Sequence, residues 1–198
     1  DFVEAFIRVK GILKSEDIPP RGHDPATQIL VEDFLPVTEV ALEGILTQGR
    51  LRVLALFDKP DPLDGPYFEE TIYVTPSRLP KSTRDLIFDC ANRTFSALGL
   101  RYGPVHTEFR INDDGIWPIE AAARSIGGLC SRALQFGTGK SLEELILLNA
   151  LESDELADER ESSAAGVMML PIPNAGVFKE IRGQSEALAV EGIEELLV

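Results

Sequence analysis

The spacing of apolar residues changes along the chain between the period of a helix and that of a strand. The helical period predicts helices over residues 2–14, 82–98, 129–136 and 142–151. Alternating or continuous apolar runs predict strands over residues 29–35, 38–46, 51–57, 71–75, 105–111 and 116–122. In the tail they predict strands over 166–171, 176–182 and 192–197, with a short helix between the last two. The mixture indicates an α+β fold with a mainly antiparallel sheet flanked by helices.

Short polar motifs mark the ends of several elements. Gln48-Gly49 is a hairpin turn signal between two predicted strands. Ser141, followed three residues later by Glu144, is a capping-box pattern that starts a helix. The segments 15–27 and 59–66 are predicted loops because they are rich in proline and glycine.

Composition excludes several kinds of partner. The 198 residues carry a formal net charge of −14, which opposes binding to nucleic acid or to an anionic membrane. No apolar run approaches the roughly 18 residues that span a bilayer. The two cysteines, Cys90 and Cys130, lie far apart in the chain, which predicts free thiols in a reducing cytoplasm. An anionic ligand would therefore need a divalent cation or local positive groups.

Two acidic residues are predicted to face each other across a hairpin. Side chains alternate faces along a strand, so Glu108 shares a face with His106 and Arg110. If residues 113–115 form a three-residue loop, Glu108 pairs directly with Glu120 on the next strand. Like charges at that separation destabilise a sheet. A raised pKa, a nearby arginine or a bound cation must compensate.

The residues after the second strand of this hairpin supply groups that suit a phosphate chain. Arg124 comes four residues after Glu120, and Gly127-Gly128 let backbone amides approach an anion. Mg²⁺ prefers one or two carboxylates together with phosphate oxygens and water. A magnesium–phosphate site is one interpretation of this pattern. The other is that both glutamates are solvated on an exposed sheet face, balanced by Arg110 and Arg124.

These motifs resemble the magnesium-binding hairpin of the ATP-grasp superfamily, which has Glu on one strand and Glu-x-Asn-x-Arg on the next. The matching segments are His106-Thr-Glu-Phe-Arg110, Trp117-Pro-Ile-Glu-Ala-Ala-Ala-Arg124 and Gly127-Gly128. The resemblance implies that Glu108 and Glu120 bind Mg²⁺, or Mn²⁺ in its place. It also implies that Arg124 steadies the transferred phosphate and the acyl phosphate. Ala122 departs from the pattern, because many members have Asn there, and this puts a third metal ligand in doubt.

The same resemblance assigns ATP-binding roles upstream. Residues 29–35 look like the strand whose backbone reads the adenine edge, and Glu39 is placed like the acid that binds the ribose. Two interpretations of Lys59 stay open: it reaches a phosphate, or it lies free in its loop. The implied ATP-binding residues are Glu32, Asp33, Phe34, Leu35, Glu39 and Lys59.

Several other side chains are expected to be structural. Glu43 is predicted to be a solvated sheet residue, and His106 to satisfy the polar face of the sheet rather than line a substrate site. Met168 and Met169 are predicted core residues.

The tail motif Met168-Met-Leu-Pro-Ile-Pro-Asn-Ala-Gly176 resembles the L-amino-acid-ligase branch of the superfamily. The resemblance implies the C-terminal part of an ATP-grasp enzyme without its N-terminal lobe. The expected organisation is an ATP-grasp domain over 1–152, an acidic loop over 153–163 and a small β-rich subdomain over 164–198 that packs on the core.

The implied activity is an ATP- and Mg²⁺-dependent ligase that joins a small-molecule carboxylate to an amine through an acyl phosphate. The alternatives are an enzyme acting on bicarbonate, like a carboxylase or carbamoyl-phosphate synthase, and a non-catalytic binding module. The tail motif favours the ligase, whereas Ala122 favours the module. By itself the chain is expected to bind ATP weakly and not to turn over. A homodimer formed through the tail stays open.

Overall fold

The computed structural model describes residues 1–14, 28–36, 38–61, 70–137, 139–153, 163–172, 174 and 176–197. The predicted loop at 15–27, most of the loop at 59–66 and most of the acidic loop at 153–163 lie outside this part. None of the described helices is both long and apolar enough to cross a membrane.

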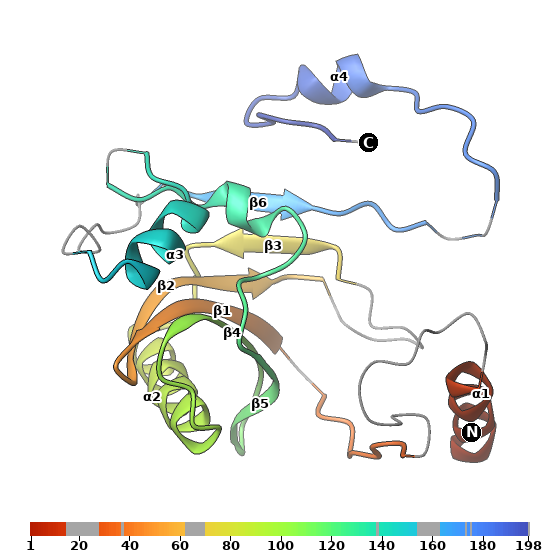
Figure 1. Cartoon of the computed structure of the whole chain (residues 1–198). Helices are drawn as coiled ribbons and strands as arrows, with labels where there is room; N and C mark the ends of the chain where they lie inside the picture. The colour runs from red at the N-terminus through yellow and green to blue at the C-terminus, as the bar shows by residue number, and fades with distance from the viewer. Residues whose placement is uncertain are drawn as a thin grey trace.

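One antiparallel sheet of six strands forms the centre of the molecule (Figure 1). The strands are β1 (Thr38–Thr47), β2 (Arg50–Lys59), β3 (Ile72–Thr75), β4 (Gly103–Asn112), β5 (Gly115–Ala122) and β6 (Ala165–Met168). Their order across the sheet is β5-β4-β1-β2-β3-β6, and every neighbouring pair is antiparallel. Because β1 lies between β4 and β2, its residues from Glu39 to Leu46 are all buried. The predicted α+β fold with an antiparallel sheet is confirmed.

Helices cover both faces of the sheet and create two apolar clusters. α2 (Lys81–Ala97) lies on one face, and its buried residues are Ile87, Cys90, Ala91 and Phe95. They join Val40, Leu42, Leu46, Leu56, Val105 and Phe109 from the strands. The short 3₁₀ helix η2 (Cys130–Ala133) and α3 (Leu142–Ala150) lie on the other face, where the cluster includes Ala41, Ala55, Phe57, Tyr73 and Leu145. Both cysteines are buried and free, as predicted.

The predicted turn and cap are both present. Gln48 and Gly49 have φ values of 53° and 80°, the left-handed pair that matches the twist of a two-residue hairpin. At the start of α3, the Ser141 hydroxyl accepts from the Glu144 amide while the Glu144 carboxylate accepts from the Ser141 amide. These local signals fix where the elements begin and end.

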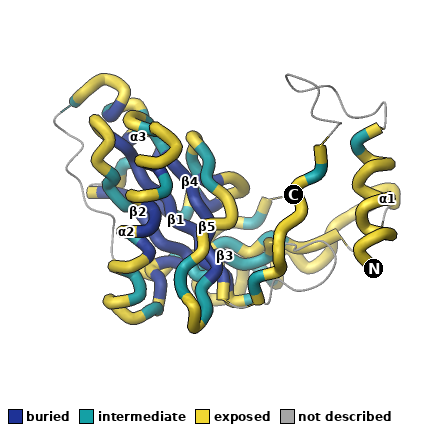
Figure 2. Tube along the Cα trace, turned by 90° about the horizontal axis from the view of Figure 1, so that it is seen from below, coloured by how far each residue is buried: buried dark blue, intermediate teal, exposed yellow. Residues whose placement is uncertain are grey.

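The two ends of the chain stand apart from the sheet (Figure 1). α1 (Phe2–Leu13) has no buried residue, although it carries apolar side chains such as Phe2 and Ile7. The short α4 (Gln184–Leu188) is likewise without a buried residue. Figure 2 shows the contrast, with the central strands buried and both ends exposed.

Several predicted elements are wrong. Residues 28–36 form no strand because no strand of the described sheet pairs with them. The predicted helix 129–136 is reduced to the four residues of η2. In the tail, only residues 165–168 form a strand, whereas the described residues of 176–182 and 192–197 have none. β6 pairs with β3 and extends the main sheet, while the domain boundary at 153–163 stays a prediction.

Candidate functional site

The sheet face opposite α2 carries charged side chains in register. Because residues alternate faces along each strand, every second residue of β1, β2, β4 and β5 contributes to it. Across the strands, the rows are Lys59–Glu39–Arg110, Phe57–Ala41–Glu108–Glu120 and Ala55–Glu43–His106–Ala122. This face therefore collects residues that are far apart in the sequence.

The two glutamates of the β4–β5 hairpin lie opposite each other, as predicted, but the turn and the strand register that bring them together differ from the prediction. Asn112 pairs with Gly115, so the turn contains two residues rather than three. A bulge between Glu108 and Phe109 then inserts one extra residue in β5, because Phe109 pairs with Pro118 and Glu108 with Glu120. The turn is one residue shorter than predicted and the bulge adds one residue, so the two differences cancel. The predicted pairing of Glu108 with Glu120 is confirmed.

Lys59 lies among three carboxylates at the edge of this face. Its Nζ is 2.6 Å from Glu39 Oε1, 2.6 Å from Glu70 Oε1 and 2.8 Å from Glu108 Oε1. The Lys59 side chain is only 2% exposed, so the interpretation of a free loop lysine is wrong. Burial by itself would lower the pKa of Lys59, but these carboxylates outweigh it and raise the pKa above its usual value.

Arg110 joins the same cluster to the segment before β1. Its Nε donates to Glu39 Oε2 at 2.9 Å, and its Nη1 donates to the Leu35 carbonyl at 2.7 Å. The guanidinium also lies 5.1 Å from the centre of the Phe34 ring. Both carboxylate oxygens of Glu39 are thus bonded to buried cations, and the predicted ribose contact of Glu39 stays a prediction.

Glu43 is fully buried, so the prediction that it is a solvated residue is wrong. Its Oε2 accepts from the Ile126 amide at 2.9 Å, which anchors the loop after β5 over the sheet. The same oxygen is 3.6 Å from His106 Nδ1. Burial raises the pKa of Glu43 despite these contacts.

His106 lies between two acids. Its Nε2 is 3.6 Å from Glu108 Oε1, and its Nδ1 faces Glu43. Burial alone would lower the pKa of His106, but Glu108 and Glu43 outweigh it and raise the pKa to about 9. Burial would raise the pKa of Glu108, but His106 and Lys59 lower it to about 2. At neutral pH the face therefore holds a charged imidazolium and a charged Glu108 carboxylate.

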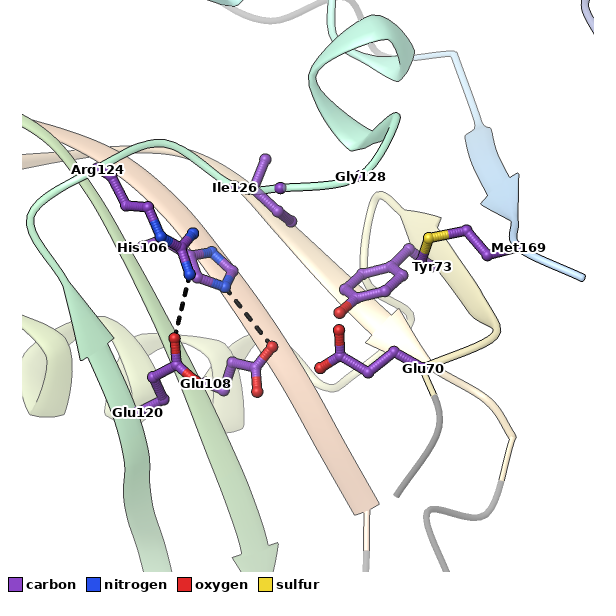
Figure 3. Close-up of a pocket in the computed structure, with 10 residues that line it drawn as sticks. Glu70, Tyr73, His106, Glu108, Glu120, Arg124, Ile126, Gly128 and Met169 are labelled. Atoms are coloured by element: carbon purple, nitrogen blue, oxygen red, sulfur yellow. Dashed lines mark hydrogen bonds and ion pairs between the residues drawn. The ribbon is translucent and has the colours of Figure 1, made fainter. Parts of the chain in front are cut away.

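A pocket of about 160 Å³ opens above these residues (Figure 3). Its polar side chains come from Glu70, Tyr73, His106, Glu108, Glu120 and Arg124, and Ile126, Gly127, Gly128 and Met169 complete the wall. Figure 3 shows Glu70 and the Tyr73 hydroxyl pointing toward one another across from His106 and Glu108. Gly128 has a φ of 61°, and a Cβ there would come within 3.1 Å of the Met169 sulfur. The positive φ therefore favours glycine where the loop passes Met169.

Arg124 and Glu120 form the exposed side of the pocket. Arg124 Nη2 is 3.2 Å from Glu120 Oε1, and the two side chains are 55% and 53% exposed. Such a pair contributes little to stability and can exchange partners. Glu108 and Glu120 thus face each other with different surroundings, one buried among cations and the other open to solvent.

The structure brings together only some of the residues that the sequence singles out. Lys59, Glu39, Glu108, Glu120 and Arg124 share the charged face or its pocket. Residues 32–34 are exposed, although the Phe34 ring lies against Arg110, and the Leu35 carbonyl accepts from Arg110. His106 lies on the polar face of the sheet, as predicted, but it also lines the pocket, which is the alternative that the prediction set aside.

Glu70 and Tyr73 escape the sequence analysis, which also expects Met169 to be a core residue and not part of a pocket. Glu70 and Tyr73 come from the short β3 region, and Met169 follows β6 at the far edge of the sheet. No spacing signal connects them with the β4–β5 hairpin, because β1 and β2 separate these strands in the sheet. Met169 packs on the core as predicted. Met168 is 65% exposed, because side chains alternate between the two faces along the edge strand β6 and Met168 lies on the exposed face.

Comparison with known proteins places this geometry in a family. The model of the ATP-grasp domain matches residues 1–133. Alanine–anticapsin ligase of Bacillus subtilis strain 168 is 30% identical over 139 residues, which are 63% of this chain and 28% of that ligase. The ligase of the same name from Bacillus amyloliquefaciens is 28% identical over 137 residues, again 28% of its length. The chain thus spans little more than a quarter of these curated relatives.

Solved structures agree with the sequence comparison. The L-amino acid ligase from Bacillus licheniformis has a TM-score of 0.72 and 34% identity, covering 82% of this chain and 41% of that one. The ATPase subunit of phosphoribosylaminoimidazole carboxylase from Aquifex aeolicus has a TM-score of 0.57 at 19% identity, covering 79% and 46%, and shares the fold. The match to the ATP-grasp domain covers more than half of the chain. The chain belongs to the ATP-grasp family.

Proposed function

We propose that this chain supplies the metal-binding part of an ATP-dependent ligase that joins a carboxylate to an amine through an acyl phosphate. The observation that carries the proposal is the pairing of Glu108 with Glu120 beside Arg124 at one pocket. The similarity to an alanine–anticapsin ligase and to an L-amino acid ligase supports amino acids as the substrate class. The activity belongs to the whole protein, and we expect the 198 residues by themselves not to turn over.

The donor groups fit a magnesium ion. Glu108 carries a negative charge at neutral pH, and Glu120 lies opposite it with an exposed side chain. Two carboxylates with room for phosphate oxygens and water are the ligands that Mg²⁺ prefers. When bound, the ion would neutralise charge on the phosphates of ATP. Glu108 and Glu120 would hold it, with Mn²⁺ as a substitute.

Other residues near the pocket hold its loop in place or supply positive charge. Arg124 is exposed and can leave Glu120 to contact a phosphate group, as expected of a side chain in a weak surface pair. Glu43 fixes the loop that carries Arg124 and Gly128 by binding the Ile126 amide. Catalysis of phosphoryl transfer depends mainly on such positioning and on charge neutralisation.

The size of the pocket limits what it holds. Its volume of about 160 Å³ is below the roughly 300–1,000 Å³ of most small-molecule sites. It suits the reacting phosphate and a small carboxylate, and the rest of a nucleotide would extend beyond it. Glu32, Asp33, Phe34 and Leu35 are proposed to contact ATP there, through a segment that Arg110 ties to the sheet.

The proposal is tested by ADP release from the full-length protein with pairs of amino acids. We expect release to require an amino acid, and hydroxylamine to trap an acyl hydroxamate in place of the second amine. Glu120→Gln should abolish release, whereas Asp89→Asn, on the exposed side of α2, should not change it. Release that requires bicarbonate and no amino acid would overturn the proposal in favour of a carboxylase.

A further inference from the structure

Lys59 occupies a position that a metal ion takes in many acidic sites. One ligand atom each from Glu39, Glu70 and Glu108 lies within 4.8 Å of the other two, close enough for all three to bind a single ion. The Lys59 ammonium lies at the centre, at 2.6–2.8 Å from three carboxylate oxygens. These separations are only slightly longer than the 2.3–2.6 Å of calcium–oxygen contacts.

The contacts of Lys59 extend over four neighbouring strands. Lys59 ends β2, Glu39 comes from β1, Glu108 from β4, and Glu70 lies two residues before β3. On its remaining side, the ammonium lies 5.0 Å from the centre of the Tyr73 ring of β3. One buried cation therefore joins adjacent strands directly beneath the pocket that Glu70, Tyr73 and Glu108 line.

The charges of the cluster require a cation at this place. Three carboxylates that share one small volume repel each other, and buried charges are stable only when paired. Arg110 balances the other oxygen of Glu39. Lys59 is the described side chain that contacts all three acids.

We propose that Lys59 is a positioning residue whose ammonium acts as a built-in cation at the centre of Glu39, Glu70 and Glu108. It fixes Oε1 of Glu108 and so sets how this carboxylate is presented to the pocket. It also excludes a metal ion from the three-acid cluster, which keeps the cluster separate from the pair Glu108 and Glu120. Only the consequence for the catalytic metal rests on the proposed function.

The test replaces the ammonium with a neutral side chain of similar length. In Lys59→Met, the three acids lose their cation, and Glu70, whose side chain is 43% exposed, offers a route from solvent. We expect the variant to bind one more Tb³⁺ ion than the wild type. The nearby Tyr73 ring should sensitise its luminescence on excitation of tyrosine. Equal stoichiometry in variant and wild type would overturn the proposal.

Two further variants locate the new site. Lys59→Met combined with Glu39→Gln should lose the additional ion, because one of the three ligands is gone. Lys59→Met combined with Tyr73→Phe should keep the ion and lose most of the sensitised signal.

Ca²⁺ at about 100 times its dissociation constant should also raise the Tm of Lys59→Met by about 5 °C or more, relative to sodium chloride of equal ionic strength. Wild type should show a shift at most half as large.

A measurement on the unaltered chain covers the case in which Lys59→Met does not fold. A buried ammonium with three acceptors exchanges its protons slowly, so Lys59 should give a ¹H–¹⁵N cross-peak of the NH₃⁺ group at neutral pH. Glu70→Gln should shift this peak, whereas Asp85→Asn, at the exposed pair with Lys81 on α2, should leave it unchanged. A spectrum without a protected ammonium assignable to Lys59 would overturn the proposal.

The same variant separates this inference from the proposed function. In the full-length protein, Lys59→Met should raise the Mg²⁺ concentration for half-maximal ADP release about tenfold, with a smaller change in kcat. If the additional Tb³⁺ site appears but wild type releases no ADP with any amino acid, the proposed function fails and the role of Lys59 stands. If wild type is an active ligase and the additional site is absent, the role of Lys59 fails alone.

Discussion

Both faces of the central sheet carry an apolar cluster, but the face opposite α2 also carries buried charged side chains. On the α2 side, β1 presents Val40 and Leu42, which pack with Phe95 in an apolar cluster. On the opposite side, β1 presents Glu39 and Glu43, which are equally buried but bound to charged or polar partners. The alternation of β1 thus contributes to an apolar core on one face and to a layer of mixed apolar and charged residues on the other.

The two faces should respond differently to substitution. Apolar contacts are numerous and individually weak, so the cost of a substitution follows the volume removed. The charged face depends on each ion having its partner, and the loss of one member leaves others buried and unpaired. The proposed metal site lies on the second face, where the same side chains would serve both stability and chemistry.

The largest expected effect is on the apolar face. Phe95→Ala removes a fully buried ring from the cluster under α2 and should lower the free energy of unfolding by about 3–5 kcal/mol. Urea unfolding measures this loss. The position of the Lys59 ammonium cross-peak should remain that of wild type, and a change in that peak would show that the two faces are not separable.

The pH dependence of stability should come from the charged face. The pKa of His106 rises from 6.5 to about 9 on folding, so its stabilising contribution is complete below pH 6.5 and is lost as the pH rises through 9. Between these values the free energy of unfolding should fall by at most about 3 kcal/mol. Urea unfolding in the presence of EDTA measures the free energy at each pH. In His106→Gln, the free energy of unfolding should change less with pH over this range. A wild-type curve that rises over this range would contradict the charge assignment.

A smaller loss is expected when the charges of Glu39 are removed without changing its shape. Glu39→Gln leaves Lys59 and Arg110 each with one neutral partner in place of a carboxylate. The free energy of unfolding should fall by about 2 kcal/mol. Arg110 should also hold residues 34–35 less firmly, which faster amide exchange at Leu35 would report. If the variant were as stable as wild type, the ion pairs of Glu39 with Lys59 and Arg110 would not compensate for the free-energy cost of burying their charges.

The smallest effect on stability is expected at Glu120. Its pair with Arg124 is more than half exposed, so Glu120→Gln should change the free energy of unfolding by no more than about 0.5 kcal/mol. The same change should abolish ADP release by the full-length protein. Loss of several kcal/mol would place Glu120 with the structural charges rather than with the proposed metal site.

The central strands and hairpins could be predicted because their signals are local. The turn at Gln48-Gly49, the cap at Ser141 and the alternation in β1 and β4 each depend on neighbouring residues. Pairing of Glu108 with Glu120 was also predictable, although its turn and bulge were not, because two local errors cancel in the register. Local pattern is therefore sufficient for strands in the middle of the sheet.

Long-range contacts could not be predicted in the same way. Residues 29–35 have the apolar run of a strand but no neighbour in the described sheet, and Met168 points outward because β6 is an edge. Lys59 has three acidic partners that come from three separate segments, so no spacing in the sequence reveals the cluster. The burial of Glu43 likewise depends on the loop that crosses above it.

Metal binding by the proposed ligase depends on Glu108 and Glu120 acting on the same cation. The most direct measurement is the binding of Mn²⁺ in the presence of ATP, followed by electron paramagnetic resonance on the full-length protein. We expect Glu108→Gln and Glu120→Gln each to weaken binding at least about tenfold, and the double variant to be little worse than the weaker single one, because residues that act as a unit are not additive. Mn²⁺ affinities within twofold of wild type in both single variants would contradict the account.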